Sequence, residues 1–234
     1  MLILGIESAT AQVGCAIGGH EGVLARFESA RGRRHVETLV PAIDFVRRQA
    51  QIELEEIGAV AVDIGPGLYT GLRVGIATAK AISLALRVPM IGVPSLDLLA
   101  FPARFSSRLI AAVIDARRGE VFWALYRQVP GGVQRISPYR ASRAAEVAGD
   151  LAASSDEVLL LGDGVHRYRE TFAEIDRAEI ADASFAHPSA GPLVQLAHAR
   201  ALREDWVNHW EIEPLYLRKP DAEINWRTRA EAGR

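Results

Sequence analysis

Residues 57–86 read IGAVAVDIGPGLYTGLRVGIATAKAISLAL, and this stretch decides how the chain folds. Its first nine residues, 57–65, are a continuous apolar run bounded by glycines, which is typical of a strand buried on both faces. Residues 70–86 have apolar positions at helical spacing. Gly65, Pro66 and Gly67 lie between the two and predict a tight loop, so the stretch is a strand, a loop and a helix in succession.

Two interpretations of this loop remain open. Backbone amides at the start of a helix can hold an anion, and glycines let a phosphate approach closely, which makes Gly65 and Gly67 candidates for phosphate binding. The stretch matches neither G-x-x-x-x-G-K-[ST] nor G-x-G-x-x-G, however. The alternative is a tight turn whose glycines adopt left-handed conformations, with Thr70 capping the helix that follows.

The predicted helix carries a ridge of small residues, Gly71, Gly75, Ala79 and Ser83, at steps of four and about 18 Å long. Glycine in a helix interior costs about 1 kcal/mol relative to alanine. Gly75 therefore indicates that a larger side chain would clash with a close neighbour. That neighbour is either the sheet of the same chain or a second protein.

The elements on either side of this stretch predict a sheet covered by helices. For the first hundred residues we expect strands at 2–7, 13–18, 23–28, 57–65 and 89–93, helices at 35–50 and 70–86, and a turn at Gly18 and Gly19. Pro41 bends the first helix or marks its entry. This order of strands and helices is that of a ribonuclease-H-like unit with a mixed sheet.

A second, reduced round of the same pattern follows. We expect strands at 108–116, 120–127, 133–137 and 157–162, a turn at Gly131 and Gly132, and helices at 142–153 and 188–205. The prediction is an α/β fold of two ribonuclease-H-like units with mixed sheets, as in the actin-like ATPase (ASKHA) superfamily. The predicted division is residues 1–104 joined by the helical region 188–217, a smaller unit at 105–187, and a polar tail at 218–234.

Composition excludes several classes of function. The formal net charge of −2 provides no overall positive field for nucleic acid, so RNA contact would need a local patch or a partner. The single Cys15 lies in an apolar strand pattern and is expected in the core. The start of the chain has no signal-peptide pattern and no run is long enough to span a membrane, so we expect a cytoplasmic protein without membrane contact. The absence of H-E-x-x-H and G-x-S-x-G patterns argues against a peptidase.

Five dispersed motifs resemble one protein family. They are GIESAT (5–10), RHVETLVPAI (34–43), GPGLYTGLRVGIATAKA (65–81), VIDARRGEVFWALY (113–126) and EPLYLRKPDA (213–222). Together they resemble the TsaB (YeaZ) family of bacterial tRNA threonylcarbamoyladenosine biosynthesis proteins. The resemblance extends over residues 3–222, with Val36 where that family commonly has serine.

The resemblance implies an accessory protein with particular partners. These are a catalytic TsaD-like paralogue, which transfers threonylcarbamoyl to the adenosine beside the anticodon, and TsaE, a P-loop ATPase, with tRNA reached indirectly. In the family the first two helices contact TsaD or, when the protein is alone, a second copy in a homodimer. The matching positions here are His35, Leu39, Ile43, Thr70, Gly71, Arg73, Val74, Gly75, Thr78 and Ala79. The resemblance thus favours a second protein as the neighbour of the small-residue ridge.

The same resemblance argues against catalysis by this chain. Two metal-binding histidines four residues apart in the catalytic paralogue correspond to Ser95 and Leu99. We therefore expect no catalytic residues, no metal and no cofactor. The alternative is a stand-alone actin-like ATPase or nucleotide-binding protein, with Glu7 positioning metal and water beside a nucleotide loop at Gly65 and Gly67. In that case Glu7→Ala should abolish ATP binding, whereas our preferred interpretation makes Glu7 structural.

Two arginine groups are candidates for RNA contact or, alternatively, for solvated or ion-paired surface. They are Arg31, Arg33 and Arg34 before the first helix, and Arg117 and Arg118 in a later turn. The four tryptophans do not form a stacking platform in the sequence, and core or interface packing accounts for them.

Overall fold

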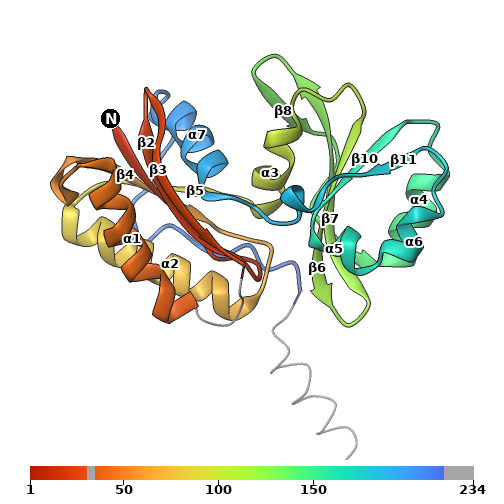
Figure 1. The fold of residues 1–234 in the computed structure, drawn as a ribbon, viewed down its shortest axis with the longest axis horizontal. Helices are drawn as coiled ribbons and strands as arrows, with labels where there is room; N and C mark the ends of the chain where they lie inside the picture. Colours follow the sequence, from red (N-terminus) through yellow and green to blue (C-terminus); the bar gives the residue numbers. More distant parts are fainter. Residues whose placement is uncertain (31–34, 219–234) are drawn as a thin grey trace, which may run out of the picture.

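The computed structural model describes residues 1–30 and 35–218 and contains two β-sheets with helices packed against them (Figure 1). The first sheet has five strands in the order β3-β2-β1-β4-β5. These strands are β1 (Leu2–Glu7), β2 (Val13–Gly19), β3 (Gly22–Ser29), β4 (Ile57–Asp63) and β5 (Met90–Val93). Strand β1 pairs antiparallel with β2 and parallel with β4, so the sheet is mixed as predicted.

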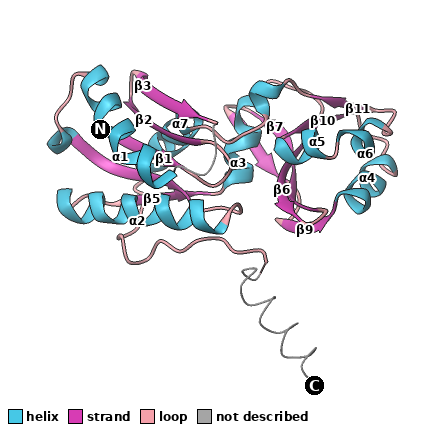
Figure 2. Cartoon of the chain, turned by 60° about the horizontal axis from the view of Figure 1, so that its bottom comes forward, coloured by secondary structure: helices cyan, strands magenta, loops and turns pink. Residues whose placement is uncertain are grey.

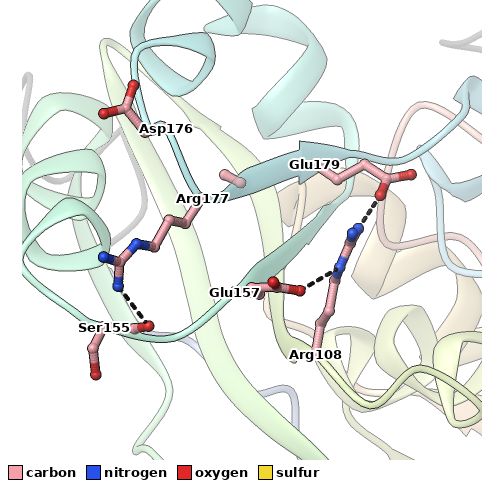
Figure 3. Close-up of a pocket in the computed structure, with 7 residues that line it drawn as sticks. Arg108, Ser155, Glu157, Asp176, Arg177 and Glu179 are labelled. Atoms are coloured by element: carbon pink, nitrogen blue, oxygen red, sulfur yellow. Dashed lines mark hydrogen bonds and ion pairs between the residues drawn. The ribbon is translucent and has the colours of Figure 1, made fainter.

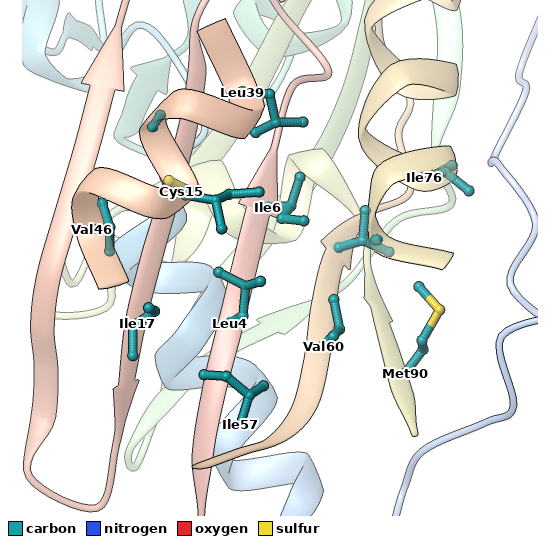
Figure 4. Close-up of a cluster of buried hydrophobic side chains, with 14 of the residues drawn as sticks. Leu4, Ile6, Cys15, Ile17, Leu39, Val46, Ile57, Val60, Ile76 and Met90 are labelled. Carbon is teal, nitrogen blue, oxygen red and sulfur yellow. The ribbon is translucent and has the colours of Figure 1, made fainter. Parts of the chain in front are cut away.

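Helices cover both faces of the first sheet. They are α1 (His35–Ala50), α2 (Tyr69–Leu86) and α7 (Ala190–Ala201). Because side chains alternate along a strand, Leu4 and Ile6 face one core and Ile3 faces the other. The core of Leu4 and Ile6 lies under α1 and α2 (Figure 4), and that of Ile3 lies under α7. Helices α1 and α2 lie side by side (Figures 1 and 2).

The second sheet has six strands, in the order β11-β10-β6-β7-β8 with β9 also paired to β7. They are β6 (Leu109–Arg117), β7 (Glu120–Val129), β8 (Gly132–Arg135), β9 (Arg140–Arg143), β10 (Val158–Leu161) and β11 (Ala178–Ile180). Strand β6 pairs parallel with β10 and antiparallel with β7. The expected strands are present, whereas β9 and β11 were missed because they have only four and three residues.

The second sheet has short helices. They are α3 (Ser95–Ala100), α4 (Ala144–Ala152), α5 (Asp163–Arg167) and α6 (Arg169–Ala173). Helix α3 lies between the two sheets, and its Leu96 and Leu99 join the core on one face of the second sheet (Figure 1). Val147 of α4 and Phe172 of α6 pack on the other face. The second unit is therefore reduced in its helices and not in its strands; the domain boundaries stay a prediction.

Two expected turns are shifted, the first by two residues and the second by one, so that Gly131 does lie in its turn. The first hairpin turns at residues 20–21, because Gly18 and Gly19 pair with β3. A Cβ atom on Gly18 would lie 2.3 Å from the carbonyl oxygen of Gly22, so glycine here serves close packing and not a turn. The later hairpin turns at residues 130–131, and Gly132 begins β8. Helix α7 is also shorter at both ends than the expected 188–205.

The segment after α7, residues 202–218, connects the two sheets. Val207 pairs with Met90 at the edge strand β5, and the Leu215 amide donates to the Ile64 carbonyl (2.7 Å). Leu217 packs into the core of the second sheet, and Arg218 pairs with Glu120 at 2.7 Å. This segment, termed the strap below, therefore lies against the loop that follows β4. Across the described part of the chain, every helix is too short or too polar to span a membrane.

Candidate functional site

The loop after β4 is held by contacts within the chain. Gly65 has φ +99, and a Cβ atom there would lie 3.1 Å from the carbonyl oxygen of Leu215 in the strap. A Cβ atom on Gly67 would lie 2.2 Å from the Ala9 carbonyl oxygen, which also accepts a 2.6 Å hydrogen bond from the Leu68 amide. Packing therefore requires glycine at position 67, and the left-handed backbone conformation expected of the turn favours glycine at position 65.

The prediction that Thr70 caps α2 is wrong. The N-cap residue is Leu68, which has no side-chain capping bond, and Thr70 is already inside the helix. The first turn is anchored instead by the Ala9 carbonyl and by the hydroxyl of Ser8, which donates to the Gly71 carbonyl (2.9 Å). The start of α2 is thus fixed by the end of β1.

Two carboxyl groups lie buried beside this loop, at the carboxyl ends of β1 and β4. Glu7 is 0% exposed and accepts a 2.8 Å hydrogen bond from the Ala9 amide; Asp63 is 2% exposed and accepts from the Gly65 amide (2.7 Å) and the Ser95 hydroxyl (2.6 Å). Burial, and then the neighbouring Asp63, raise the pKa of Glu7 well above its usual range. Burial raises the pKa of Asp63 to about 7. Among described residues, nothing donates to Glu7 Oε2 or Asp63 Oδ2.

These features disfavour nucleotide binding at Glu7, Gly65 and Gly67, although that role stays an untested prediction. The amides of Gly65 and Leu68 already donate to acceptors of the chain itself. The strap lies over Gly65, and the adjacent acids are either neutral or negative, so neither form attracts a phosphate. Glu7 therefore fits the structural role that we preferred from the sequence.

The small-residue ridge of α2 faces its own sheet. A Cβ atom on Gly71 would lie 2.1 Å from the Ser8 carbonyl oxygen, and one on Gly75 would lie 2.2 Å from the Ser8 hydroxyl. Ala79 and Ser83 are also buried. The expectation that a second backbone fills this ridge is corrected, because Ser8, directly after β1, occupies it at Gly71 and Gly75, and Ala79 lies in the core of the first sheet.

The ten predicted interface residues divide into two groups. Besides the ridge residues, Leu39 and Ile43 of α1 are at most 6% exposed and belong to the core. The remaining five reach the outer surface to different extents: His35, Thr70, Arg73, Val74 and Thr78. Their role in binding a partner stays a prediction.

Two further residues of α1 complete the outer surface. Val36 and Val40 are 69% and 61% exposed, although they recur at helical spacing with the buried Leu39 and Ile43. They lie one turn apart on α1, at the border of the buried stripe to which Leu39 and Ile43 belong. The signal in the sequence that could have revealed these two residues is that the apolar positions of α1 extend around more of the helix than one buried face needs. We define the outer face as Val36, Val40, Thr70, Arg73, Val74 and Thr78. It leaves out His35, whose Nε2 atom lies 2.9 Å from the Thr10 carbonyl oxygen of the same chain.

Ser95 and Leu99 occupy the positions that the resemblance assigns to metal-binding histidines in the catalytic paralogue. Both are buried, at 0% and 2% exposure, and Ser95 is bonded to Asp63. They serve the packing of α3 between the sheets. Within residues 1–30 and 35–218, no cluster of three or more His, Cys, Asp or Glu side chains is arranged to hold a metal ion.

The second sheet has a polar cluster at the carboxyl ends of β6 and β10. Asp115 is 5% exposed, and Arg117 and Arg167 both contact its Oδ2 atom, at 3.2 and 3.3 Å. Arg118, the other arginine predicted in this turn, is exposed and also has an interaction partner. The group Arg31, Arg33 and Arg34 lies outside the described residues.

The tryptophans differ in exposure. Trp123 is 3% exposed in the second core, as expected, and its indole donates to Ser142 (3.2 Å). Trp206 and Trp210 are 37% and 65% exposed and border a groove of about 610 Å³ at the end of α2, so core packing does not explain them. Trp226 lies outside the described residues.

The two mixed sheets, with helices on both faces of the first, define an α/β protein of the actin-like ATPase (ASKHA) class. The crystal structure of the ethanolamine utilization protein EutJ from Carboxydothermus hydrogenoformans shares this fold at 11% identity, with a TM-score of 0.52 over 84% of this chain and 90% of that one. Residues 23–226 match the family model described as TsaD, tRNA N6-adenosine threonylcarbamoyltransferase.

Full-length relatives narrow the assignment. Proteins named tRNA threonylcarbamoyladenosine biosynthesis protein TsaB are 26% identical in Bacillus subtilis, over 97% of this chain and 98% of the relative, and 29% identical in Escherichia coli, over 93% and 95%. The structure of YeaZ from Pseudomonas aeruginosa is 27% identical, with a TM-score of 0.81 over 92% and 99%. The chain belongs to the TsaB/YeaZ family.

Proposed function

We propose that this chain is a non-catalytic accessory subunit in the biosynthesis of threonylcarbamoyladenosine on tRNA. Its full-length relatives carry that biosynthesis in their names, and the matching family model is described as a transferase that modifies a tRNA adenosine. Ser95 and Leu99, at the positions of the histidine pair of the catalytic paralogue, are buried packing residues. The chain therefore supports the transfer that its catalytic paralogue performs.

The outer face of α1 and α2 is the proposed contact with that TsaD-like paralogue. The observation that carries this proposal is the exposure of Val36 and Val40 beside the stripe of α1 that packs in the core. Adjacent exposed apolar side chains mark interaction surfaces. When the paralogue is absent, two copies of the chain pair through the same face. The P-loop ATPase TsaE joins the pair that this chain forms with its TsaD-like paralogue.

The test is the double substitution Val36→Glu and Val40→Glu. Both side chains are more than 60% exposed, so the fold and the melting temperature should be unchanged. Two carboxylates placed in an apolar contact should abolish co-elution with the paralogue and the formation of modified tRNA in a reconstituted reaction with TsaE. Leu202→Glu is the matched control, because Leu202 is 75% exposed and follows α7 on the opposite face.

Two results would overturn the proposal separately. Normal pairing by the folded double variant would show that the outer face is not the contact. Full modification of tRNA without this chain would show that it is not an accessory subunit. Gly75→Arg, which the ridge alone suggests as a test, is unsuitable because the side chain would collide with Ser8 and unfold the protein.

A further inference from the structure

The polar cluster at the carboxyl ends of β6 and β10 has no part in the pairing proposed above. These two strands are parallel, and ligands of α/β sheets bind at the carboxyl ends of parallel strands. Asp115 near the end of β6 and Asp163 directly after β10 meet here, and Asp163 accepts a 2.9 Å hydrogen bond from the Asp115 amide. The cluster thus occupies the edge of the second sheet where a ligand is expected.

Asp115 holds two guanidinium groups side by side. Its Oδ2 atom lies 3.2 Å from Arg117 Nη1 and 3.3 Å from Arg167 Nε, and its Oδ1 atom accepts from the Tyr168 hydroxyl (3.3 Å). The carboxylate side chain is 4% exposed, whereas the arginine side chains are 51% and 57% exposed. The Asp115 carboxylate therefore lies beneath the two guanidinium groups, and the side chain of Asp163 is 26% exposed. Because Arg118 lies in the same turn, the arginines outnumber these two acids, and an approaching ligand meets net positive charge.

The backbone of this turn is kept in an unfavourable conformation. Arg117, Arg118 and Gly119 have φ values of 66, 56 and 81, three left-handed residues in succession. Residues with a Cβ atom rarely adopt this conformation, and such outliers concentrate at functional sites. A glycine or asparagine would form the same hairpin more easily. The turn therefore presents arginine side chains where the backbone alone would favour other residues.

We propose that Arg117, Arg118 and Arg167 form a contact site for phosphate groups of an RNA backbone. Guanidinium groups bind phosphate oxygens through paired hydrogen bonds. The exposure of Arg117 and Arg167 favours a polymer lying across the surface, because a free nucleotide is normally buried over most of its area. The site depends on the second sheet and adds direct RNA contact to the proposed function without requiring the outer face.

The test measures binding of a fluorescent RNA stem-loop to the full chain by anisotropy across a salt series starting at about 50 mM. Arg117→Gln and Arg167→Gln are measured singly and together, so the test stands even if the double variant does not fold. Each substitution should weaken binding for every RNA sequence alike. Each should also lower the slope of log K against log salt by about 0.7–0.9, as expected for one lost phosphate contact.

Arg108→Gln is the matched control. Arg108 is paired with Glu157 and Glu179 at the opposite, amino-terminal ends of β6 and β10 (Figure 3), so its loss should leave the slope unchanged. An equal loss in Arg108→Gln would overturn the site in favour of non-specific attraction. Absence of RNA binding by the wild-type chain at about 100 µM in low salt would also overturn it. Displacement of RNA by tripolyphosphate at equal phosphate concentration would overturn the assignment to RNA.

Discussion

The carboxyl edges of the two sheets use acidic side chains in opposite ways. At the first edge, Glu7 and Asp63 are buried together and receive hydrogen bonds only from amides and the hydroxyl of Ser95 among described residues. At the second edge, Asp115 is equally buried but contacts the guanidinium groups of Arg117 and Arg167. Both edges lie at the carboxyl ends of parallel strands, but the buried carboxyl groups of the first edge have hydrogen bonds alone, whereas Asp115 at the second edge also has positively charged partners.

This difference indicates which of the two edges can bind an anion. Without a nearby cation, burial favours the protonated form of a carboxyl group, so the first edge becomes a closed, neutral packing region beneath the strap. With two exposed arginines above it, the acid of the second edge serves to position positive charge at the surface. We therefore expect stability to depend mainly on the first edge and ligand contact on the second.

The largest expected effect is a decline of stability with pH that belongs to the first edge. The folded-state pKa of Asp63 is raised to about 7 and that of Glu7 is also raised, so the folded chain holds protons that the unfolded chain has lost. This contribution is complete below about pH 4, the unfolded pKa, and is lost as pH rises through about 7. The free energy of unfolding should fall over that range by up to roughly 4 kcal/mol.

Urea denaturation across this pH range measures the effect. Asp63→Asn should remove the part of the decline that belongs to Asp63 and leave the part that belongs to Glu7, because asparagine keeps the hydrogen bonds without titrating. Asp163→Asn at the second edge should remove less, because burial raises the pKa of Asp163 only to about 6. Unaltered pH dependence in Asp63→Asn would contradict the assignment of a neutral first edge.

A second prediction concerns the tight contact between α2 and the end of β1. Gly71→Ala places a Cβ atom 2.1 Å from the Ser8 carbonyl oxygen, a backbone atom that cannot rotate away. The variant should lose about 3 kcal/mol in urea denaturation. Gly149→Ala is the control, because space around Gly149 in α4 is open and alanine should stabilise that helix by up to about 1 kcal/mol. If neither substitution lowers the free energy of unfolding, the small-residue ridge of α2 does not pack tightly against Ser8.

A third prediction concerns the charge of Asp115 at the second edge. Asp115→Asn keeps an acceptor for the Arg117 amide but removes the charge shared by the two guanidinium groups. The free energy of unfolding should fall by about 2 kcal/mol. Asp156→Asn, which breaks an exposed pair with Arg127, should change it little. If both variants are equally stable, Asp115 does not position the arginines.

The smallest effect is expected for Ser95→Ala. It removes one hydrogen bond to Asp63 and should cost about 1 kcal/mol. Because this bond lowers the pKa of Asp63, its loss should move the midpoint of the pH-dependent decline to higher pH. A midpoint that stays in place would show that Ser95 does not act on Asp63.

Local patterns in the sequence predicted the main elements. Both long helices of the first unit, α1 and α2, match the expected ranges closely, because their apolar spacing is regular. The short elements β9, β11, α3, α5 and α6 were not predicted, since a few residues carry too little periodicity. The turn at Gly18 and Gly19 was misplaced because glycine marks close packing as well as turns.

The sequence identified the two helices of the candidate site but not which of their side chains are exposed. Leu39, Ile43 and the ridge residues of α2 were assigned to a partner, but the structure buries them, while Val36 and Val40, which were not among the predicted contact residues, are exposed. Helical spacing shows that residues share a helix and not which neighbour each side of that helix meets. The convergence of Arg117 and Arg167 on Asp115 joins residues fifty positions apart, which no local pattern reveals.

By itself the sequence determined the order of the longer strands and helices and, through dispersed motifs, the TsaB/YeaZ family, because these depend on residue type and spacing along the chain. The tertiary structure decided which faces of α1 and α2 are buried, that the strap lies against the glycine loop, and which acids have cations above them. Burial and charge pairing arise between residues distant in sequence, so only the packed chain defines them.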